Sequence, residues 1–204
     1  MARRTREEAE KTRQLLLDTA LEQYAAQGIS NISLKAIAAS AGVTHGALYW
    51  HFKNRDDLVL AIAESYILPF ELCYLEQLQA IDQNALKALK SFLMDVIQML
   101  ISDKQAMQVY MLLYSRRHEL PQVSELQQRL LDEFQLWMSY INRFLKQARK
   151  QKHISKKTKE SPVAEMLLCQ VFGVLNVAEN LAAEDVKPLA QLTITSAIKG
   201  LEAI

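Results

Sequence analysis

The chain has 204 residues, a formal net charge of +1 and 50% hydrophobic residues. This length allows one large domain or two small ones with a real core, and the nearly neutral charge excludes a protein that is basic over its whole surface. Only five Gly and four Pro interrupt a sequence rich in Ala, Leu, Gln, Glu and Lys, which favours helices. We predict an all-α fold.

The first part of the chain predicts three helices. Apolar residues keep helical spacing over residues 8–27, and Gly28 is suited to the left-handed position that ends such a helix. Ser33 offers a cap for a second, short helix that Gly42 closes, and Thr44 caps a third. Two short helices joined by a turn that contains Gly predict a helix-turn-helix.

The remainder predicts longer helices. A periodic helix continues from Leu58 to Phe70, and Pro69 inside it predicts a kink or a break. The last three helices of the chain are each expected to begin near a proline. We expect these further helices at 84–102, 104–117, 121–150, 161–182 and 187–203.

The stretch GVTHGALYWHF, residues 42–52, places Tyr49, Trp50 and His51 in succession. Consecutive helical residues are turned about 100° apart, so these side chains cannot all face one core. An exposed aromatic with a polar tip can donate to a phosphate while its ring packs on a sugar or a thymine methyl. We expect Tyr49 and His51 to contact DNA, whereas Trp50 either does the same or packs half-buried against a neighbouring helix.

The start of the same helix is suited to DNA as well. The Thr44 hydroxyl can bind a phosphate, Gly46 keeps the helix start free of a side chain, and a helix N-terminus favours an anion. His45 is expected at the tip, where it meets a base or a phosphate. Leu48 and Phe52, four residues apart, are expected to fasten the helix to the core.

The segment SLKAIAASAGVTHGALYWHFKNRDDL, residues 33–58, resembles the DNA-binding signature of the TetR family of transcriptional repressors. Residues 1–21 are similar to the branch that contains AcrR, TtgR and MtrR, which repress multidrug efflux pump genes. In that branch Arg is common at the position of His45, and Lys at that of Arg55. Because Arg is the usual reader of guanine, we expect a different operator sequence. The resemblance implies base or phosphate contacts from Ser33, Lys35, Thr44, His45, Gly46, Tyr49, Trp50, His51 and Arg55, with Arg3, Arg4 and Arg6 as an arm near the DNA.

The long helical remainder is expected to hold a ligand. Helical bundles bind small molecules between helices, in pockets lined by apolar and aromatic side chains. Met and aromatic residues at helical spacing are either pocket lining or plain core, and the sequence leaves both open at each position. The candidates for binding a bulky apolar or aromatic inducer are Tyr66, Phe70, Phe92, Val96, Met99, Met107, Tyr110, Met111, Tyr114, Phe134, Trp137, Met138, Ile141 and Phe172.

The last two helices are strongly apolar, which predicts a homodimer through a four-helix interface. A twofold dimer would place two recognition helices about 34 Å apart on palindromic double-stranded operator DNA. We therefore divide the chain into residues 1–58, the helix-turn-helix DNA-binding domain, and residues 59–204, the ligand-binding and dimerisation domain.

Residues 143–159 contain eight Lys or Arg and no acid. This charge run is either a solvated connection between helices or a second anion-binding patch.

No nucleotide-binding loop, zinc-protease motif or nucleophile elbow occurs, and the four His lack metal-ligand spacing with the two Cys. We expect no enzyme, cofactor or metal. Cys73 and Cys169 are expected to be buried free thiols of a reducing cytoplasm, and the apolar run 166–178 a core helix without a membrane partner. The expected function is a repressor of a multidrug efflux operon that its inducer releases. The alternatives are a helical small-molecule-binding or adaptor protein without DNA affinity, and a regulator of a metabolic operon.

Overall fold

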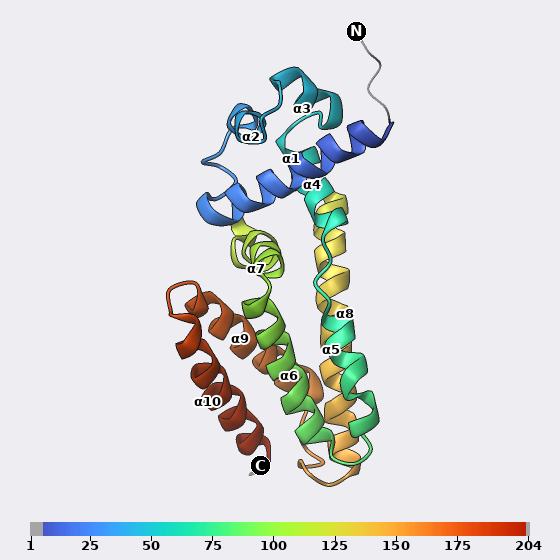
Figure 1. The fold of residues 1–204 in the computed structure, drawn as a ribbon. Helices are drawn as coiled ribbons and strands as arrows, with labels where there is room; N and C mark the ends of the chain where they lie inside the picture. Colours follow the sequence, from blue (N-terminus) through green and yellow to red (C-terminus); the bar gives the residue numbers. More distant parts are fainter. Residues whose placement is uncertain (1–5, 203–204) are drawn as a thin grey trace. The chain divides into compact units, whose positions relative to one another are not determined.

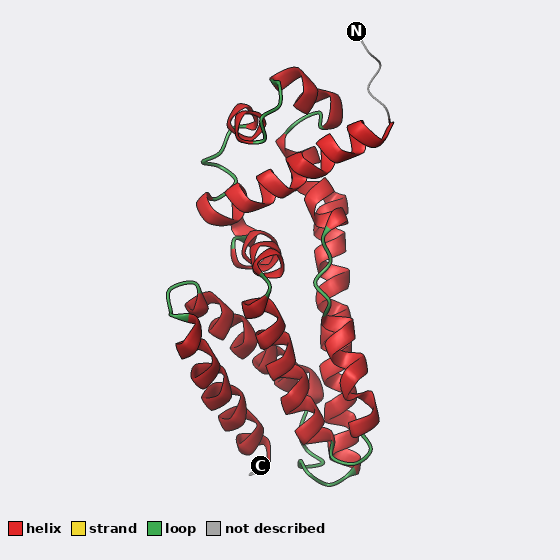
Figure 2. Cartoon of the chain, in the orientation of Figure 1, coloured by secondary structure: helices red, strands yellow, loops and turns green. Residues whose placement is uncertain are grey.

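The computed structural model describes residues 6–202, and over this range the chain is helical with no strand (Figures 1 and 2). The all-α prediction is confirmed. Within the described range the chain forms two compact units. The first contains the residues up to Leu68 together with Gln105–Arg129, and the second contains Pro69–Lys104 together with the residues from Leu130 onward. The functional division at residue 58 stays a prediction.

The first unit opens with α1 (Arg6–Gln27), α2 (Leu34–Ser40), α3 (His45–His51) and α4 (Arg55–Ser65). Gly28 ends α1 with φ +87°, as predicted. The apolar faces of these helices share one core, since α1 contacts α2, α3 and α4, and α2 contacts α3. The largest buried side chains of this core are Leu16, Leu17, Leu21, Tyr24, Ile37, Leu48, Phe52 and Leu58.

A second segment completes the first unit. The predicted helix over 104–117 is wrong in its second half, because α7 (Lys104–Tyr110) passes into a π-helical turn, η2 (Met111–Ser115), and a 3₁₀ turn, η3 (Arg117–Glu119). Met111, Leu112 and Leu113 are all buried, and η2 contacts α1. In an α-helix three consecutive side chains spread over about 200°, so burying all three favours the wider π turn.

The break predicted near Pro69 is confirmed, but it begins earlier. α4 ends at Ser65, and α5 (Phe70–Gln77) starts only after an extended stretch. Pro69 lacks a backbone N–H and disfavours helical backbone at the residue before it, which explains why the chain leaves the helix here. α4 is therefore not continuous with α5. This division raises the count from the nine helices expected to ten α-helices over residues 6–202.

The second unit holds α5, η1 (Leu78–Ala80), α6 (Ala85–Ser102), most of α8 (Ser124–Lys150), α9 (Glu160–Ala178) and α10 (Ala183–Glu202). Two predicted starts are displaced. α8 begins at Ser124 instead of Pro121, and α10 begins at Ala183 with Pro188 inside it. Glu184 and Asp185 in the first turn of α10 favour the earlier start, because acids stabilise the positive end of a helix.

The core of the second unit contains an aromatic cluster at its centre. Tyr74 stacks on Tyr140 with ring centroids 4.1 Å apart, and Phe92 stacks on Phe144 at 5.6 Å. α6 packs against α5, α9 and α10.

Most of the apolar residues that predicted a dimer interface are buried within the chain itself. Leu167, Val171 and Leu175 of α9 and Ile194 of α10 have no exposed surface. α9 is long and apolar enough to cross a membrane by length and composition alone, yet it packs on α6 and α10. The large apolar side chains that remain exposed on these two helices and their connection are Met166, Val177, Leu181 and Leu192.

Candidate nucleic-acid interface

The turn between α2 and α3 is built as the sequence predicts. The Ser33 hydroxyl accepts a hydrogen bond from the Ala36 N–H at the start of α2, and the Thr44 hydroxyl accepts one from the Ala47 N–H at the start of α3. Gly42 takes φ +66° between them, a conformation that L side chains rarely adopt. The turn therefore holds α2 and α3 as a helix-turn-helix (Figure 1).

α3 has one face toward the core and one toward solvent. Leu48 and Phe52 are 0% and 2% exposed, which confirms that they fasten the helix. Tyr49 is 47% exposed and Trp50 is 73% exposed. The exposure of Trp50 excludes the half-buried packing that the sequence left open, so this indole is available to a partner.

The outward side chains of α3 form two ring pairs. The His45 and Tyr49 rings meet edge to face at 4.7 Å, and the Trp50 and His51 rings do so at 4.6 Å. Each pair limits the rotamers of its members, so the aromatic surface is partly organised before any partner arrives. A Cβ added at Gly46 would meet nothing within 4 Å, so no contact inside the protein requires glycine there.

Three basic side chains surround a hollow beside the first ring pair. This surface cavity of about 390 Å³ joins the start of α2, the face of α3 and the start of α4. Lys35, Lys53 and Arg55 bring positive charge to it, and Tyr49 lies on its wall. The full lining is Ser33, Leu34, Lys35, His45, Tyr49, Lys53, Asn54 and Arg55.

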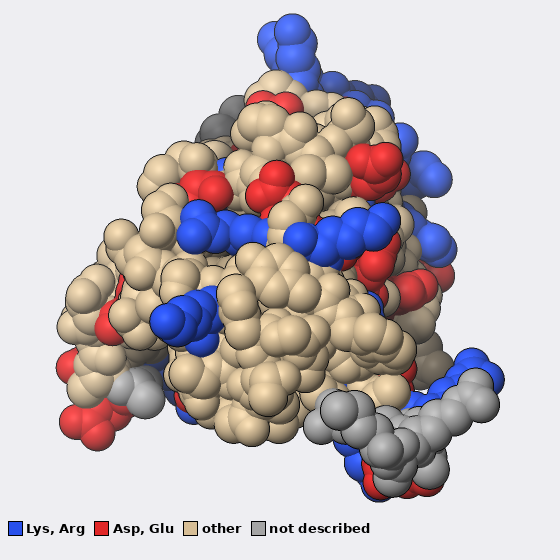
Figure 3. All heavy atoms as spheres, turned by 90° about the horizontal axis from the view of Figure 1, so that it is seen from above, with Lys and Arg blue, Asp and Glu red and all other residues tan. Residues whose placement is uncertain are grey.

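Positive side chains gather locally on the surface, although the net charge of the chain is only +1. Figure 3 views the molecule from above and shows a broad area of uncharged side chains bounded on one side by a row of Lys and Arg, beyond which acidic side chains appear. A phosphate backbone is attracted by such a local concentration of cations, whereas the total charge of the chain decides little.

Arg55 makes a hydrogen bond within the fold and also lines the hollow. Its guanidinium donates to the Ile32 carbonyl at 3.2 Å. It also lies close to the buried Tyr24: burial raises the pKa of that phenol to about 12, and the positive charge of Arg55 lowers it in part. Arg55 also lines the hollow, beside Lys53.

Eight of the predicted DNA-contacting residues lie on α2, α3 and their two N-caps, and Arg55 lies at the rim of the hollow. Trp50 and His51 lie farther along α3, outside the hollow lining. Lys53 was not predicted, although the basic turn Lys53-Asn54-Arg55 could have indicated it. Arg6 begins α1, whereas Arg3 and Arg4 lie outside the described residues.

The predicted ligand-binding residues divide between the two units. In the second unit the Trp137 ring contacts Phe70 at 4.1 Å and Phe172 at 6.3 Å, while Phe92 belongs to the aromatic cluster of Tyr74. Tyr66 in the first unit donates its hydroxyl hydrogen to Asp18 and accepts one from Gln14. The first unit holds Tyr66, Met107, Tyr110, Met111 and Tyr114, and the second holds Phe70, Phe92, Val96, Met99, Phe134, Trp137, Met138, Ile141 and Phe172.

No group of three His, Cys, Asp or Glu side chains with metal-binding geometry occurs among residues 6–202. Cys73 is buried as predicted, whereas Cys169 is exposed, contrary to the expectation.

The capped turn, the fastened α3 and its exposed polar and aromatic face define a helix-turn-helix DNA-binding domain. Residues 16–62 match the family described as "Bacterial regulatory proteins, tetR family". The chain therefore carries the DNA-binding domain of the TetR family, as the sequence resemblance predicted.

Relatives of this chain are transcriptional regulators. The HTH-type transcriptional regulator AcrR of Shigella flexneri is 40% identical over 108 residues, which are 52% of this chain and 49% of that protein. This match therefore spans about half the length of AcrR.

Two solved structures share the fold over nearly the whole chain. NalD, the secondary repressor of the MexAB-OprM multidrug efflux pump in Pseudomonas aeruginosa, superposes with a TM-score of 0.73 and 24% identity, covering 96% of this chain and 98% of NalD. The complex of SmeT with triclosan has a TM-score of 0.66 and 23% identity, covering 93% of this chain and 91% of SmeT. SmeT is the repressor of the Stenotrophomonas maltophilia pump SmeDEF.

Proposed function

We propose that this protein is a cytoplasmic transcriptional repressor of a multidrug efflux operon, released from its operator by a bulky apolar or aromatic small molecule. One observation carries the DNA-binding half of the proposal. α3 is fastened by Leu48 and Phe52 while its aromatic and polar side chains are exposed beside a hollow that Lys35, Lys53 and Arg55 make positive.

The hollow and the outward face of α3 contact different groups of the DNA. The three cations and the hydroxyls of Ser33, Thr44 and Tyr49 bind phosphates, which fixes the register of α3 in the major groove. His45 and Trp50 are left to meet base edges and thymine methyl groups. Gly46 lets the backbone approach, His51 supports Trp50 through their ring contact, and Arg3 and Arg4 act as the arm.

The inducer half rests on the helical architecture and on relatives. SmeT, which shares the fold, forms a complex with triclosan, an aromatic compound. In the second unit Trp137 and Phe70, both buried, form an aromatic cluster with Phe172 that could line an inducer site if the bundle opens. A ligand can release the operator only if it binds the DNA-incompetent state more tightly. Inducer binding has to change the position of the helix-turn-helix. Because α4 ends at Ser65, this change is not passed on through one rigid helix that continues to Phe70.

We infer a homodimer that reads a palindromic operator, since two half-sites one helical turn apart match a twofold protein. The exposed Met166, Val177, Leu181 and Leu192 support an interface formed by α9 and α10. The interface is smaller than the sequence suggested, because the inner faces of both helices are already buried in the chain.

The experiment is selection of binding sites from a library of random DNA duplexes, followed by fluorescence anisotropy on the selected site at several salt concentrations. The double variant Tyr49→Ala/His51→Ala and the single variant Lys35→Ala are compared with Lys87→Ala, an exposed lysine of α6. We expect the first two to weaken binding about tenfold or more and the control to leave it unchanged.

Two outcomes would contradict the proposal. A chain that selects no duplex and shows no salt-dependent retention on DNA would favour the adaptor function. An aromatic compound that binds tightly but leaves the operator affinity unchanged would remove the release mechanism for that compound. If the selected sequence occurs in the genome beside genes of a metabolic pathway, the proposal would be redirected to a metabolic operon.

A further inference from the structure

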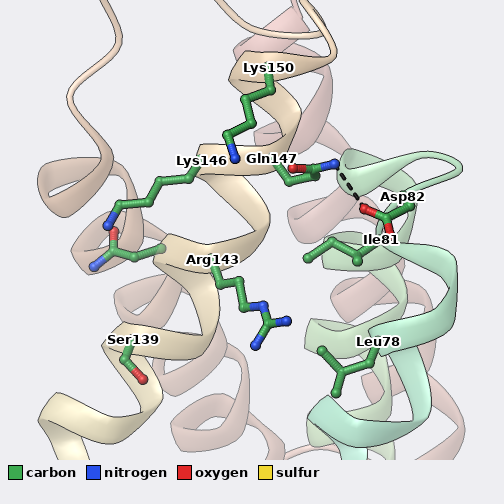
Figure 4. A pocket seen from close by; sticks show the side chains of 9 residues that line it. Leu78, Ile81, Asp82, Ser139, Arg143, Lys146, Gln147 and Lys150 are labelled. Atoms are coloured by element: carbon green, nitrogen blue, oxygen red, sulfur yellow. Dashed lines mark hydrogen bonds between the residues drawn. The ribbon is translucent and has the colours of Figure 1, made fainter.

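The second unit has a cavity that the functions above do not use. It measures about 680 Å³ and lies between the C-terminal half of α8 and the segment from η1 to Asp82 (Figure 4). This volume is within the range of small-molecule sites. None of its residues is a predicted contact to DNA or to an apolar inducer. The lining is Leu78, Ile81, Asp82, Ser139, Asn142, Arg143, Lys146, Gln147 and Lys150.

The spacing of the α8 residues explains why they share one wall. Residues three and four apart lie on one face of a helix, so 139, 142, 143, 146, 147 and 150 form a single stripe. Arg143, Lys146 and Lys150 give this stripe three positive charges. The first and the last of them are seven positions apart, which is about 10 Å along the helix axis.

These cations are not explained by ion pairs within the fold. Over residues 6–202 no carboxylate lies within ion-pair distance of Arg143, Lys146 or Lys150, whereas the neighbouring Arg149 pairs with Glu160 at 2.8 Å. The negative end of the helix dipole accounts for Lys150 in the last turn but reaches neither of the other two. The Arg143 guanidinium lies 6.0 Å from the centroid of the Tyr74 ring, which orients it without neutralising it.

The opposite wall is fixed and mostly apolar. The Gln151 amide donates to the carbonyls of Ile81 and Asp82 at 2.9 Å and accepts from the Ala85 N–H at 2.8 Å. The Gln147 amide donates to the Asp82 carboxylate at 2.9 Å. α8 and the wall that faces it are thus joined before any ligand binds.

The side chains of the cavity offer two kinds of contact, cationic and apolar. Figure 4 shows the Arg143 guanidinium extended toward Leu78 and Ile81, while Lys146 extends the other way in this view. On the wall opposite α8, Leu78 and Ile81 form an apolar surface, which is called the apolar floor below. Arg143, Lys146 and Lys150 supply the cationic groups.

We propose that this cavity binds a small organic polyanion, with at least two phosphate or carboxylate groups on a body that rests on Leu78 and Ile81. Guanidinium and ammonium groups bind both kinds of anion, and Arg143 presents the planar fork that suits bidentate contact. A nucleoside triphosphate combines such charges with an apolar face that can rest on Leu78 and Ile81. The ligand-sized volume favours a small molecule over a duplex.

The test is calorimetric titration of the full chain with ATP, pyrophosphate and citrate at one ionic strength. ATP is expected to bind more tightly than pyrophosphate, because only ATP covers the apolar floor. Citrate against pyrophosphate distinguishes carboxylate from phosphate chemistry. The double variant Arg143→Gln/Lys150→Gln is expected to weaken the tightest of these ligands about tenfold.

Two further variants separate a built site from general surface charge. Lys156→Gln/Lys157→Gln removes the same charge from the exposed connection that follows α8 and is expected to leave binding unchanged. Asp82→Asn keeps an acceptor for Gln147 and removes the one acid of the lining, so it is expected to tighten binding severalfold.

Three results would overturn the proposal. The first is that none of the three anions binds at concentrations up to about 10 mM. The second is that the Lys156→Gln/Lys157→Gln variant loses as much anion affinity as the Arg143→Gln/Lys150→Gln variant. The third is that ATP does not bind, while a DNA duplex binds and loses affinity in the Arg143→Gln/Lys150→Gln variant. Unfolding temperatures equal to that of the unmodified chain show that the variants are folded.

Discussion

The carboxylate of Glu119 accepts a hydrogen bond from the backbone N–H of Ile29 at 2.9 Å, across 90 positions of the sequence. This bond joins η3 to the turn that follows α1 within the first unit. Gly28 lies directly beside it: a Cβ at that position would come within 2.6 Å of the carboxylate. The turn therefore depends on glycine for two reasons, its φ of +87° and the closeness of Glu119.

The double-mutant cycle of Gly28→Ala and Glu119→Ala is expected to be non-additive. Gly28→Ala strains the backbone and pushes the carboxylate off the Ile29 N–H, at a cost of about 2 kcal/mol in the free energy of unfolding. Glu119→Ala leaves that buried N–H without an acceptor, at a cost of about 1–3 kcal/mol. Because both changes break one bond, the double variant should lose about 1 kcal/mol less than the sum.

Urea unfolding of the four chains measures this coupling. Glu119→Gln, which keeps an oxygen acceptor, serves as the control and should cost less than Glu119→Ala. Strict additivity would show that Gly28 and Glu119 act independently.

Stability is expected to fall at alkaline pH because of Tyr24. The pKa of Tyr24 is about 12 in the folded chain and 10.0 in its ordinary state. Between these values the unfolded chain binds fewer protons than the folded chain, so stability falls as pH rises. Each pKa unit corresponds to about 1.4 kcal/mol, so the contribution of Tyr24 approaches about 2–3 kcal/mol by pH 12.

Comparison with Tyr24→Phe isolates this contribution from those of the other tyrosines. The Tyr24 side chain is fully buried, and Tyr24→Phe keeps the ring that packs in the core while it removes the titrating hydroxyl. Urea unfolding at pH 7 and at pH 11 should show a smaller alkaline loss for the variant. An equal loss in both chains would assign the effect to other groups.

Truncation of two residues on opposite faces of α3 is expected to separate folding from DNA binding. Leu48→Ala opens a cavity in the core and should cost about 2–5 kcal/mol of stability. Trp50→Ala should change stability by less than about 0.5 kcal/mol, since the indole is 73% exposed. On a selected duplex, however, Trp50→Ala should lower affinity by about 1–3 kcal/mol.

Thermal unfolding and fluorescence anisotropy measure the two quantities on the same samples. Trp137 remains as an internal fluorophore in the Trp50→Ala chain. An unchanged affinity of Trp50→Ala would remove Trp50 from the interface and leave the roles of Tyr49 and Lys35 intact.

The two cysteines are expected to differ in reactivity. Burial raises the pKa of Cys73 to about 11, helped by the negative charges of Asp95 and Glu76. The thiolate is the reactive form, so Cys73 should resist iodoacetamide at pH 8 in the folded chain. In 8 M urea, an ordinary unfolding concentration, it should react at the rate of a free thiol.

Mass spectrometry of the alkylated peptides reports each cysteine separately. Cys169 on the exposed side of α9 is the internal comparison, and a folded chain with Cys73 modified first would contradict the expected order.

The local features of the fold could be predicted from sequence because they depend on neighbours in the chain. Ser33 and Thr44 cap their helices through bonds to residues three positions on, and Gly28 and Gly42 adopt positive φ values. The π turn after Tyr110 could not be predicted, since it depends on α1 burying three consecutive apolar residues.

The candidate sites required contacts between distant residues. The exposed face of α3 could be predicted, but the exposure of Trp50 could not, because periodicity does not say how closely neighbouring helices approach. The charge run at 143–159 allowed an anion site, yet only the fold brings Leu78 and Asp82 opposite Arg143. The apolar pattern of α9 and α10 likewise could not tell burial inside the subunit from burial against a partner.

The turn formed by Met111–Ser115 has a consequence for domain engineering. Because η2 and Glu119 belong to the first unit, that unit is assembled from two stretches of chain separated by α5 and α6. A fragment that ends at Leu68 would lose the η2 residues that pack against α1 and the Glu119 carboxylate that accepts a hydrogen bond from the Ile29 N–H. We therefore expect that a chimera built around this helix-turn-helix folds only when it also carries residues 105–129 from the same parent.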